Sequence, residues 1–343
     1  MKSRKNETGF AFERKVRVTI LQWFAGHRRN FLWREQHAEA SLPPDPYIVL
    51  VSEIMLQQTQ TARVQEKLPL FLHEFPTLQA LAKADSATVI RAWAGMGYNS
   101  RALRLRDCAK VIVERHHGQI PASVPELLAL PGIGPYTASA VVAFAYHGDI
   151  AVVDVNIRRV YSRLLAAMPS TSDVADERTV SAFAERIYPR GESSQWHQAV
   201  MDIGALFCTA RAPKCGTCPI ETLCASAHRM QEIRKEKRPE PSWKGTPNRI
   251  WRGRVVQMLR ELEGNTTLSF GEVEQRLFAE LHQSESLFEM NDEARHTRAE
   301  WLVALLTGLE RDGILEIQRQ RKDKRGGNDT DDFSQFFLRL SKG

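Results

Sequence analysis

Four cysteines lie within seventeen residues near the middle of the chain. They are Cys208, Cys215, Cys218 and Cys224, with six, two and five residues between successive members. Zinc modules usually pair their ligands as two C-x-x-C units separated by a longer stretch, and this run holds one such unit. Iron–sulfur proteins bind their clusters through thiolates at short, uneven spacings. The spacing therefore favours one 4Fe-4S cluster over a zinc ion or disulfides.

Two carboxylates occur in mostly apolar surroundings, Glu53 in VSEIMLQQTQ and Asp154 in VVDVNIRRV. Burial would raise the pKa of Glu53, so that it stays protonated near neutral pH as a general acid. Asp154 either caps the helix that follows it or acts as an ionised carboxylate. One acid for the leaving group and one carboxylate for an oxocarbenium-like sugar would suffice to cleave an N-glycosidic bond.

A glycine-containing turn separates two helical segments in LPGIGPYTASAVVAFAY. Gly132 and Gly134 would allow left-handed dihedrals and bring backbone amides close to an anion, which the start of the next helix at Pro135 also favours. The pattern predicts a helix-hairpin-helix that contacts DNA phosphate. The alternative is a glycine-capped turn between two packed helices.

The elements that position these residues have helical periodicity from about residue 10 to 226, which predicts an all-α fold. Asp45-Pro46 and Pro121-Ala122-Ser123 are helix-start signals. Residues 227–248 are polar, charged and proline-bearing, so we expect a linker there.

Beyond the linker, residues 249–343 contain three amphipathic helical segments followed by two short strands, which is typical of a winged-helix-like domain. The charged tract 319–332 between the two strands predicts a basic hairpin tip. This tip is either a phosphate contact or a solvated loop.

Composition sets further bounds on the function. The chain has 343 residues, 43% of them hydrophobic, and a formal net charge of +6 with a pI near 9.1, which suits a polyanionic partner. The sequence contains neither the apolar region of a signal peptide nor a run of about 20 apolar residues. We therefore expect a cytoplasmic protein with no membrane partner.

Several of these motifs together resemble one family. The chain is similar to the helix-hairpin-helix DNA glycosylases that carry an iron–sulfur cluster, and among them most similar to the A/G-mismatch adenine DNA glycosylases of the MutY type. The resemblance spans about residues 10–226 and rests on LWRE, SEIMLQQTQ, GMGYNSRA, LPGIGPYTA, VVDVN, HQAVMDIGALFC and the cysteine run. It implies a glycosylase core over 1–226, with a six-helix domain at about 43–155 and a cluster domain formed by about 1–42 and 156–226.

The resemblance also implies roles for individual residues. Glu53 would protonate adenine N7, and Asp154 would stabilise the sugar cation or trap it covalently. Tyr136 and Asn156 would line the same site. Because a paired base is inaccessible inside a duplex, the adenine must be extruded and the gap filled by side chains.

The remaining predicted contacts surround the extruded base and the DNA backbone. In the family resemblance, the residues that enter the base stack are Gln57, Gln58 and Tyr98, and those near the extruded adenine are Arg34 and Gln198. The loop between the first two cysteines carries Arg211 and Lys214, which the cluster could hold toward a phosphate.

Related enzymes differ at a few positions. Endonuclease III-like enzymes have a lysine where this chain has Tyr136, and a phenol cannot form their Schiff base, so we expect a monofunctional glycosylase. Thymine-mismatch glycosylases also carry this tyrosine and a glutamate like Glu53, whereas QQTQ favours adenine. Val155 and Asn99 depart from the glycine and second tyrosine that adenine enzymes usually have.

The C-terminal region differs more from the best-known adenine enzymes than these single positions do. It lacks the Nudix-like domain and Phe-Ser-His loop with which the best-known adenine enzymes read 8-oxoguanine, and is similar to the tail of shorter, actinobacterial-type members. The sequence thus predicts a monomeric enzyme that acts on mismatched double-stranded DNA and removes adenine paired with 8-oxoguanine or guanine. Two alternatives are a thymine- or uracil-mismatch glycosylase and a catalytically inactive, cluster-bearing DNA-binding or redox-sensing protein.

Overall fold

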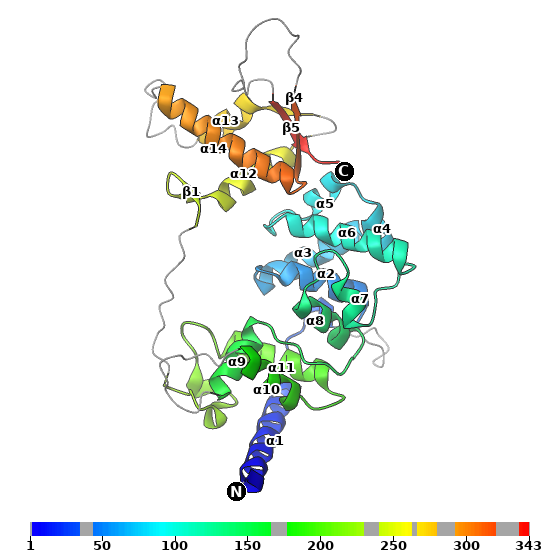
Figure 1. Cartoon of the computed structure of the whole chain (residues 1–343), viewed down its shortest axis with the longest axis vertical. Coiled ribbons are helices and arrows are strands. Elements are labelled where there is room, and N and C mark those ends of the chain that lie inside the picture. Colours follow the sequence, from blue (N-terminus) through cyan, green and yellow to red (C-terminus); the bar gives the residue numbers. More distant parts are fainter. Residues whose placement is uncertain are drawn as a thin grey trace, which may run out of the picture. The chain divides into compact units, whose positions relative to one another are not determined.

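The structure is a computed structural model, and it describes residues 2–34, 44–165, 177–229, 240–262, 266–279, 292–319 and 336–342. Its helices and short strands fall into two units (Figure 1). Unit 1 comprises Met1–Gln57 and Gln119–Glu236, and unit 2 comprises Gln58–Gly118 and Lys237–Gly343.

Unit 1 is helical throughout its described part. Its α-helices are α1 (Lys2–His27), α2 (Pro46–Leu56), α7 (Val124–Leu128), α8 (Pro135–Ala145), α9 (Val155–Leu165), α10 (Glu177–Ile187) and α11 (Ser193–Leu206). Short 3-10 turns are η1 (Leu32–Arg34), η2 (Cys215–Thr217) and η3 (Glu221–Leu223).

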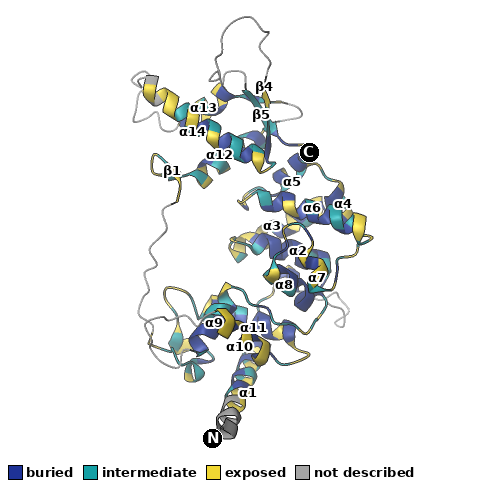
Figure 2. Ribbon diagram, viewed as in Figure 1, coloured by how far each residue is buried: buried dark blue, intermediate teal, exposed yellow. Residues whose placement is uncertain are grey.

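The α2 helix begins where the sequence predicts. Asp45 is its N-cap and accepts a hydrogen bond from Tyr47 N at 2.8 Å, and Pro46 occupies the first helical position. The helix is apolar around most of its circumference and is buried along most of its length (Figure 2). A polar side chain on α2 is therefore removed from water, which determines the chemistry of Glu53.

A second set of helices in unit 1 packs around aromatic side chains. The α9, α10 and α11 helices share a core with α1 in which Tyr161, Phe183 and Trp196 are buried. The indole of Trp196 donates to the Tyr161 hydroxyl at 2.8 Å, which satisfies both polar groups inside the core. The apolar faces of these helices thus fix α9 and α11 against each other.

The predicted helix-hairpin-helix is formed by α7, a short turn and α8. Gly132 has φ +77°, the left-handed conformation that glycine adopts at no steric cost. The expectation of left-handed dihedrals at Gly134 is wrong: this residue is the N-cap of α8 and has φ −98° and ψ 174°. A Cβ there would meet no atom within 4 Å, so the hairpin surface is open at this point.

Unit 2 combines four helices of the central sequence with the C-terminal module. The helices are α3 (Thr61–Glu74), α4 (Leu78–Lys83), α5 (Ser86–Ala92), α6 (Ser100–Arg115), α12 (Asn248–Arg260), α13 (Phe270–Phe278) and α14 (Asp292–Arg311). The strands are β1 (Ser242–Trp243), β2 (Thr246–Pro247), β3 (Leu268–Ser269), β4 (Leu315–Arg319) and β5 (Phe336–Leu340).

The C-terminal module has the predicted three helices and strand pair, here α12, α13, α14, β4 and β5. The sequence did not predict β3, which pairs antiparallel with β5 and completes a sheet of order β3-β5-β4. Two residues are too short for an alternation signal. The module is winged-helix-like, and the predicted basic hairpin tip, 319–332, lies outside the described residues except for Arg319.

The predicted linker, 227–248, extends too far, because the C-terminal module begins before residue 248. The β1–β2 hairpin lies inside this stretch, and Trp243 stacks on Trp301 of α14 with ring centroids 5.0 Å apart. The folded module therefore begins by Ser242, and residues 230–239 lie outside the described part.

The C-terminal module and the central helices of unit 2 share one hydrophobic core. Ile90 of α5 and Leu103 of α6 are buried in the same cluster as Trp251 and Leu259 of α12. This packing attaches the module to α5 and α6 through apolar side chains. No helix among the described residues has the length and apolar composition needed to cross a bilayer.

Candidate active site

Glu53 lies within α2, and its side chain is directed toward α8. The residue is only 4% exposed, and the hydroxyl of Tyr136 donates to its Oε2 at 2.8 Å. Burial raises the pKa of Glu53 to about 7, because desolvation outweighs the stabilisation of the charged form by Tyr136. The nearby charge of Asp154 raises the same pKa, and Arg34 lowers it. Glu53 is therefore substantially protonated at neutral pH.

Tyr136 is fixed at the start of α8, two residues after the Gly134 N-cap. Burial raises the pKa of its phenol far above the usual value, and the charges of Glu53 and Asp154 raise it further. The side chain therefore stays a neutral hydrogen-bond donor over the physiological pH range. It holds the Glu53 carboxyl in one orientation without competing for its proton.

Asp154 makes the capping bond that is one of the two interpretations of the sequence, and its role as an ionised carboxylate stays a prediction. It precedes α9, and its Oδ1 accepts from Ile157 N at 2.6 Å, as an N-cap does. Its Oδ2 accepts from Asn156 Nδ2 at 2.7 Å. Burial raises the pKa of Asp154 above the usual value, whereas these hydrogen bonds act to lower it. The charge of Asp154, to which Asn156 is bound, raises the pKa of both Glu53 and Tyr136, so Asp154 lies close to that pair.

Arg159 fixes the Asn156 side chain from the next turn of α9. Its Nη2 donates to Asn156 Oδ1 at 2.7 Å and to Gly204 O at 2.8 Å, and its Nε contacts Cys208 O at 2.5 Å. Gly204 is close to the same asparagine, since an added Cβ would lie 2.7 Å from Asn156 Cβ. The position of Asn156 therefore depends on close packing between α9 and α11.

The segment that precedes Asp154 is held by a buried histidine. His197 Nε2 accepts from Val152 N at 3.0 Å, and its Nδ1 lies 2.7 Å from Ser193 O. Burial lowers the pKa of His197 to about 4, so the ring is neutral. These partners fix the tautomer with hydrogen on Nδ1, and the histidine aligns the chain that leads to Asp154.

Arg34 and Gln198, predicted to lie near the extruded base, line one cavity of about 90 Å³. Both are buried, and Arg34 makes two hydrogen bonds to the fully buried Asp202, at 2.9 and 3.0 Å. The lining of this cavity does not include Glu53 or Asp154. Their assignment to a base pocket stays a prediction, although Arg34 is close enough to influence the pKa of Glu53.

The three predicted base-stack residues fall in both units. Gln57, at the end of α2 in unit 1, donates to Thr137 of α8 at 3.4 Å. In unit 2, Gln58 and Tyr98 have φ values of +56° and +45°, and Tyr98 is 53% exposed. Non-glycine residues adopt this conformation rarely, and often at functional sites.

One arginine contacts both the turn that carries Gln58 and the loop that carries Tyr98. Arg101 Nη2 donates to Thr59 Oγ1, next to Gln58, at 3.0 Å and to the carbonyl of Met96 at 3.1 Å. Its guanidinium also lies 5.7 Å from the ring centroid of Tyr98. The structure therefore brings the turn at Gln58 and the loop at Tyr98 together, and their entry into the base stack stays a prediction.

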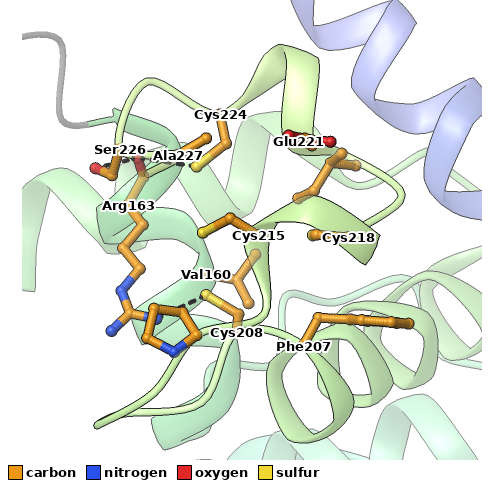
Figure 3. A pocket seen from close by; sticks show the side chains of 12 residues that line it. Val160, Arg163, Phe207, Cys208, Cys215, Cys218, Glu221, Cys224, Ser226 and Ala227 are labelled. Atoms are coloured by element: carbon orange, nitrogen blue, oxygen red, sulfur yellow. Dashed lines mark hydrogen bonds between the residues drawn. The ribbon is translucent and has the colours of Figure 1, made fainter. Parts of the chain in front are cut away.

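The four predicted metal ligands line a single pocket of about 420 Å³, including its open mouth (Figure 3). In the described part of the chain, no three His, Cys, Asp or Glu side chains are arranged to hold one metal ion. The four thiols line one shared space and lie at short, uneven spacings along the chain, which is the ligand pattern of iron–sulfur proteins. Burial raises the pKa of Cys218 to about 11, and cluster iron, when bound, would favour its ionised thiolate.

The loop between Cys208 and Cys215 is closed by backbone contacts. Lys214 N donates to Phe207 O at 2.8 Å, and Arg163 donates to the Cys208 sulfur at 3.0 Å and to Thr209 O at 2.9 Å. Both basic residues predicted for DNA contact, Lys214 and Arg211, are exposed on this loop.

Comparisons with known proteins agree with this geometry. The model of HhH-GPD superfamily base excision DNA repair proteins matches residues 51–185, and the iron–sulfur binding domain of endonuclease III matches residues 208–224. An adenine DNA glycosylase of Mycobacterium tuberculosis is 37% identical over 247 residues, which cover 72% of this chain and 79% of that protein. The chain belongs to the adenine DNA glycosylase family. It is a base-excision repair glycosylase that binds DNA and carries a 4Fe-4S cluster.

Other adenine DNA glycosylases and solved structures are also similar to this chain. The human adenine DNA glycosylase is 36% identical over 218 residues, which cover 63% of this chain and 40% of the human protein. A thermostable thymine-DNA glycosylase has a TM-score of 0.58 and 27% identity over 65% of this chain and 99% of its own. An endonuclease III–DNA complex has a TM-score of 0.53 and 20% identity over 63% of this chain and 97% of its own, which supports the fold.

Sequence reasoning missed four residues that position the site of this glycosylase, namely Arg159, His197, Asp202 and Gly204. Three of them lie in the motif HQAVMDIGALFC, which indicated the family but not what these residues do. A buried histidine or aspartate in an apolar helix would have been the available signal, because such groups need partners.

Proposed function

We propose that this protein is a monofunctional adenine glycosylase that hydrolyses the N-glycosidic bond of adenine paired with 8-oxoguanine or guanine. Its substrate would be mismatched double-stranded DNA, which it would engage as a monomer in the cytoplasm. The observation that carries the proposal is the hydrogen bond between Tyr136 and the buried Glu53. This bond joins the proton donor, Glu53, to Tyr136, whose phenol cannot form a Schiff base.

The chemistry follows from the protonation state of Glu53. With a pKa near 7, its carboxyl can give a proton to a ring nitrogen of adenine as the bond to C1′ breaks. The adenine then leaves as a neutral base, and the sugar develops the charge of an oxocarbenium ion. Tyr136 keeps Glu53 oriented during this transfer.

Asp154 supports the second half of the reaction. An ionised carboxylate near C1′ would stabilise the sugar cation or bond to it until water takes its place. Asn156 donates to Oδ2 of Asp154 and the α9 backbone donates to Oδ1, so the carboxylate is held in a fixed orientation. Water adds at C1′ and releases a proton, which restores the protonation balance at Glu53.

Recognition requires extrusion of the adenine from the duplex. Gln58 and the exposed Tyr98, both at positive φ, would fill the space left in the base stack. The open hairpin at Gly134 and the exposed Arg211 and Lys214 would contact phosphates. Cys208 and Cys215, which would bind the cluster, flank the loop that carries these two basic residues, and none of the steps above transfers an electron.

A second candidate is excision of thymine from T:G pairs, which the thymine-DNA glycosylase with a TM-score of 0.58 favours. The test is a panel of duplexes containing A:8-oxoguanine, A:G, T:G and U:G, each assayed with and without alkaline treatment. The proposal predicts cleavage of the A-containing strand after alkali only. Cleavage confined to T:G or U:G would favour the second candidate, and nicking without alkali would refute monofunctional chemistry.

A further inference from the structure

The loop that carries Tyr98, residues 95–99, is held in a strained conformation. Gly95, Gly97 and Tyr98 all have positive φ, at +82°, +68° and +45°. The two glycines adopt this conformation at no steric cost, whereas at Tyr98 it is strained and persists only where the surroundings fix it. Two carbonyls of the loop are held from within the central helices: Trp93 Nε1 donates to Gly97 O at 3.1 Å, and Arg101 donates to both Met96 O and Gly97 O.

A further contact to this loop comes from the C-terminal module. Arg260, the last residue of α12, donates through Nη2 to Asn99 Oδ1 at 2.9 Å and through Nε to Ile90 O at 3.1 Å. Desolvation lowers the pKa of Arg260, which places its guanidinium partly out of water. One side chain of the module thus binds both the end of the loop and the α5 backbone.

The Asn99 side chain binds Arg260 and does not cap its own helix. It stands at the N-cap of α6, where asparagine is favoured because its side chain can accept from the helix amides. Here the residue has φ −58° and ψ −23°, and its side chain makes no capping bond. The oxygen is instead directed to Arg260. The helix forgoes a favourable cap, and the side chain links the loop to the module.

The shared core keeps this link in place. Leu259, adjacent to Arg260, is buried in the cluster that contains Ile90 of α5 and Leu103 of α6. The arginine therefore extends from an anchored helix end, and its guanidinium spans two points of the central helices. An anchored, partly desolvated arginine constrains its partner more than an exposed ion pair does.

We propose that Arg260 is a positioning residue through which the C-terminal module holds the Tyr98 loop ready to enter the base stack. The inference rests on the proposed function, because it assigns Tyr98 to mismatch recognition. It gives the module a task in substrate discrimination that needs no contact between the module and DNA. Loss of Arg260 should weaken the preference for mismatched over paired duplex and leave the excision step nearly unchanged.

The test compares Arg260→Met and Asn99→Ala with Arg252→Met in the full-length protein. Arg252 lies on the same helix and pairs with Asp312 inside the module, so it controls for a lost arginine contact. The Kd is measured for a duplex with a non-cleavable adenine analogue opposite 8-oxoguanine and for a fully paired duplex. Single-turnover excision rates at saturating enzyme and Tm complete the comparison.

We expect Arg260→Met and Asn99→Ala each to raise the Kd for the mismatch about tenfold, with changes of about twofold or less in paired-duplex Kd and in excision rate. The mismatch Kd of the double variant should be no higher than that of either single variant, since both substitutions remove the same Arg260–Asn99 hydrogen bond. An unchanged Kd ratio, or an equal loss in Arg252→Met, would overturn the inference. Wild-type protein with no mismatch preference would refute the proposed function instead, and this inference with it.

Discussion

The Tyr136 hydroxyl and the Glu53 carboxyl are 2.8 Å apart, although their residues lie 83 positions apart in the sequence. The first sits at the start of α8 and the second inside the buried α2. Burial raises the pKa of the glutamate, and the phenol partly offsets that rise. This pair provides a carboxylic acid that can donate a proton at neutral pH and a partner that cannot act as an amine nucleophile.

Replacement of Glu53 by glutamine should abolish excision and retain DNA binding. The amide has nearly the same shape but no acidic proton, and a general acid typically contributes about 10²- to 10⁴-fold to the rate. Single-turnover excision and duplex Kd are the measurements. Residual excision within about tenfold of wild type would contradict the assignment of the acid.

The same variant should alter the pH dependence of stability. The pKa of Glu53 rises from its usual 4.5 to about 7 in the folded state, so the folded state binds more protons than the unfolded state between these pH values. The unfolding free energy of the wild type therefore falls as pH rises from about 4.5 to 7, by about 3 kcal/mol from this group. Urea unfolding at pH 5 and 8 should show a smaller fall for Glu53→Gln.

The two roles of Asp154 can be separated by two substitutions. Asp154→Asn can still cap α9, so its stability should lie within about 0.5 kcal/mol of wild type while excision is lost. Asp154→Ala loses the cap as well and should be destabilised by about 1 kcal/mol. Measurement of excision and urea unfolding for both variants tests this separation. Full activity in the asparagine variant would leave only the capping role.

Gly204→Ala should disturb the site without changing any reacting group. The added Cβ would lie 2.7 Å from Asn156 Cβ, so α9 and α11 would have to shift apart. We expect a loss of excision of about tenfold or more with a Kd for DNA near normal. Gly253→Ala is a matched control, because a Cβ there meets nothing within 4 Å. Equal behaviour of the two variants would contradict this packing account.

Removal of one cluster ligand should destabilise unit 1. Cys215→Ser is expected to lose the visible absorption of the cluster and to lower Tm, since Cys208, Cys218 and Cys224 pack against the core of α9 and α11. Cys108→Ala, in the buried face of α6, should keep both the absorption and the excision activity. A stable, fully active Cys215→Ser protein without the cluster would refute its structural role.

The sequence predicted the parts of the site that have a local signature. Asp45-Pro46 marked the start of α2, the cysteine spacing indicated a cluster, and apolar neighbours indicated the raised pKa of Glu53. Each signal depends only on adjacent residues, and pattern rules capture such signals.

The parts that the sequence did not predict depend on contacts between distant segments. Neither the link between His197 and Val152 nor that between Arg260 and Asn99 has a local pattern, because the partners are 45 and 161 residues apart. The dihedrals of Gly134 were predicted wrongly because the glycine serves as a helix cap, where extended geometry is required. Tertiary contacts determined these features.

The pH dependence of single-turnover excision tests the central claim most directly. If protonated Glu53 is the acid, the rate on an A:8-oxoguanine duplex should be constant below pH 7 and fall about tenfold per unit well above it. Tyr136→Phe removes the hydrogen bond that lowers this pKa, so its decline should begin at higher pH. A wild-type rate that stays constant from pH 6 to 9, or a decline that begins at lower pH in the phenylalanine variant, would contradict the account.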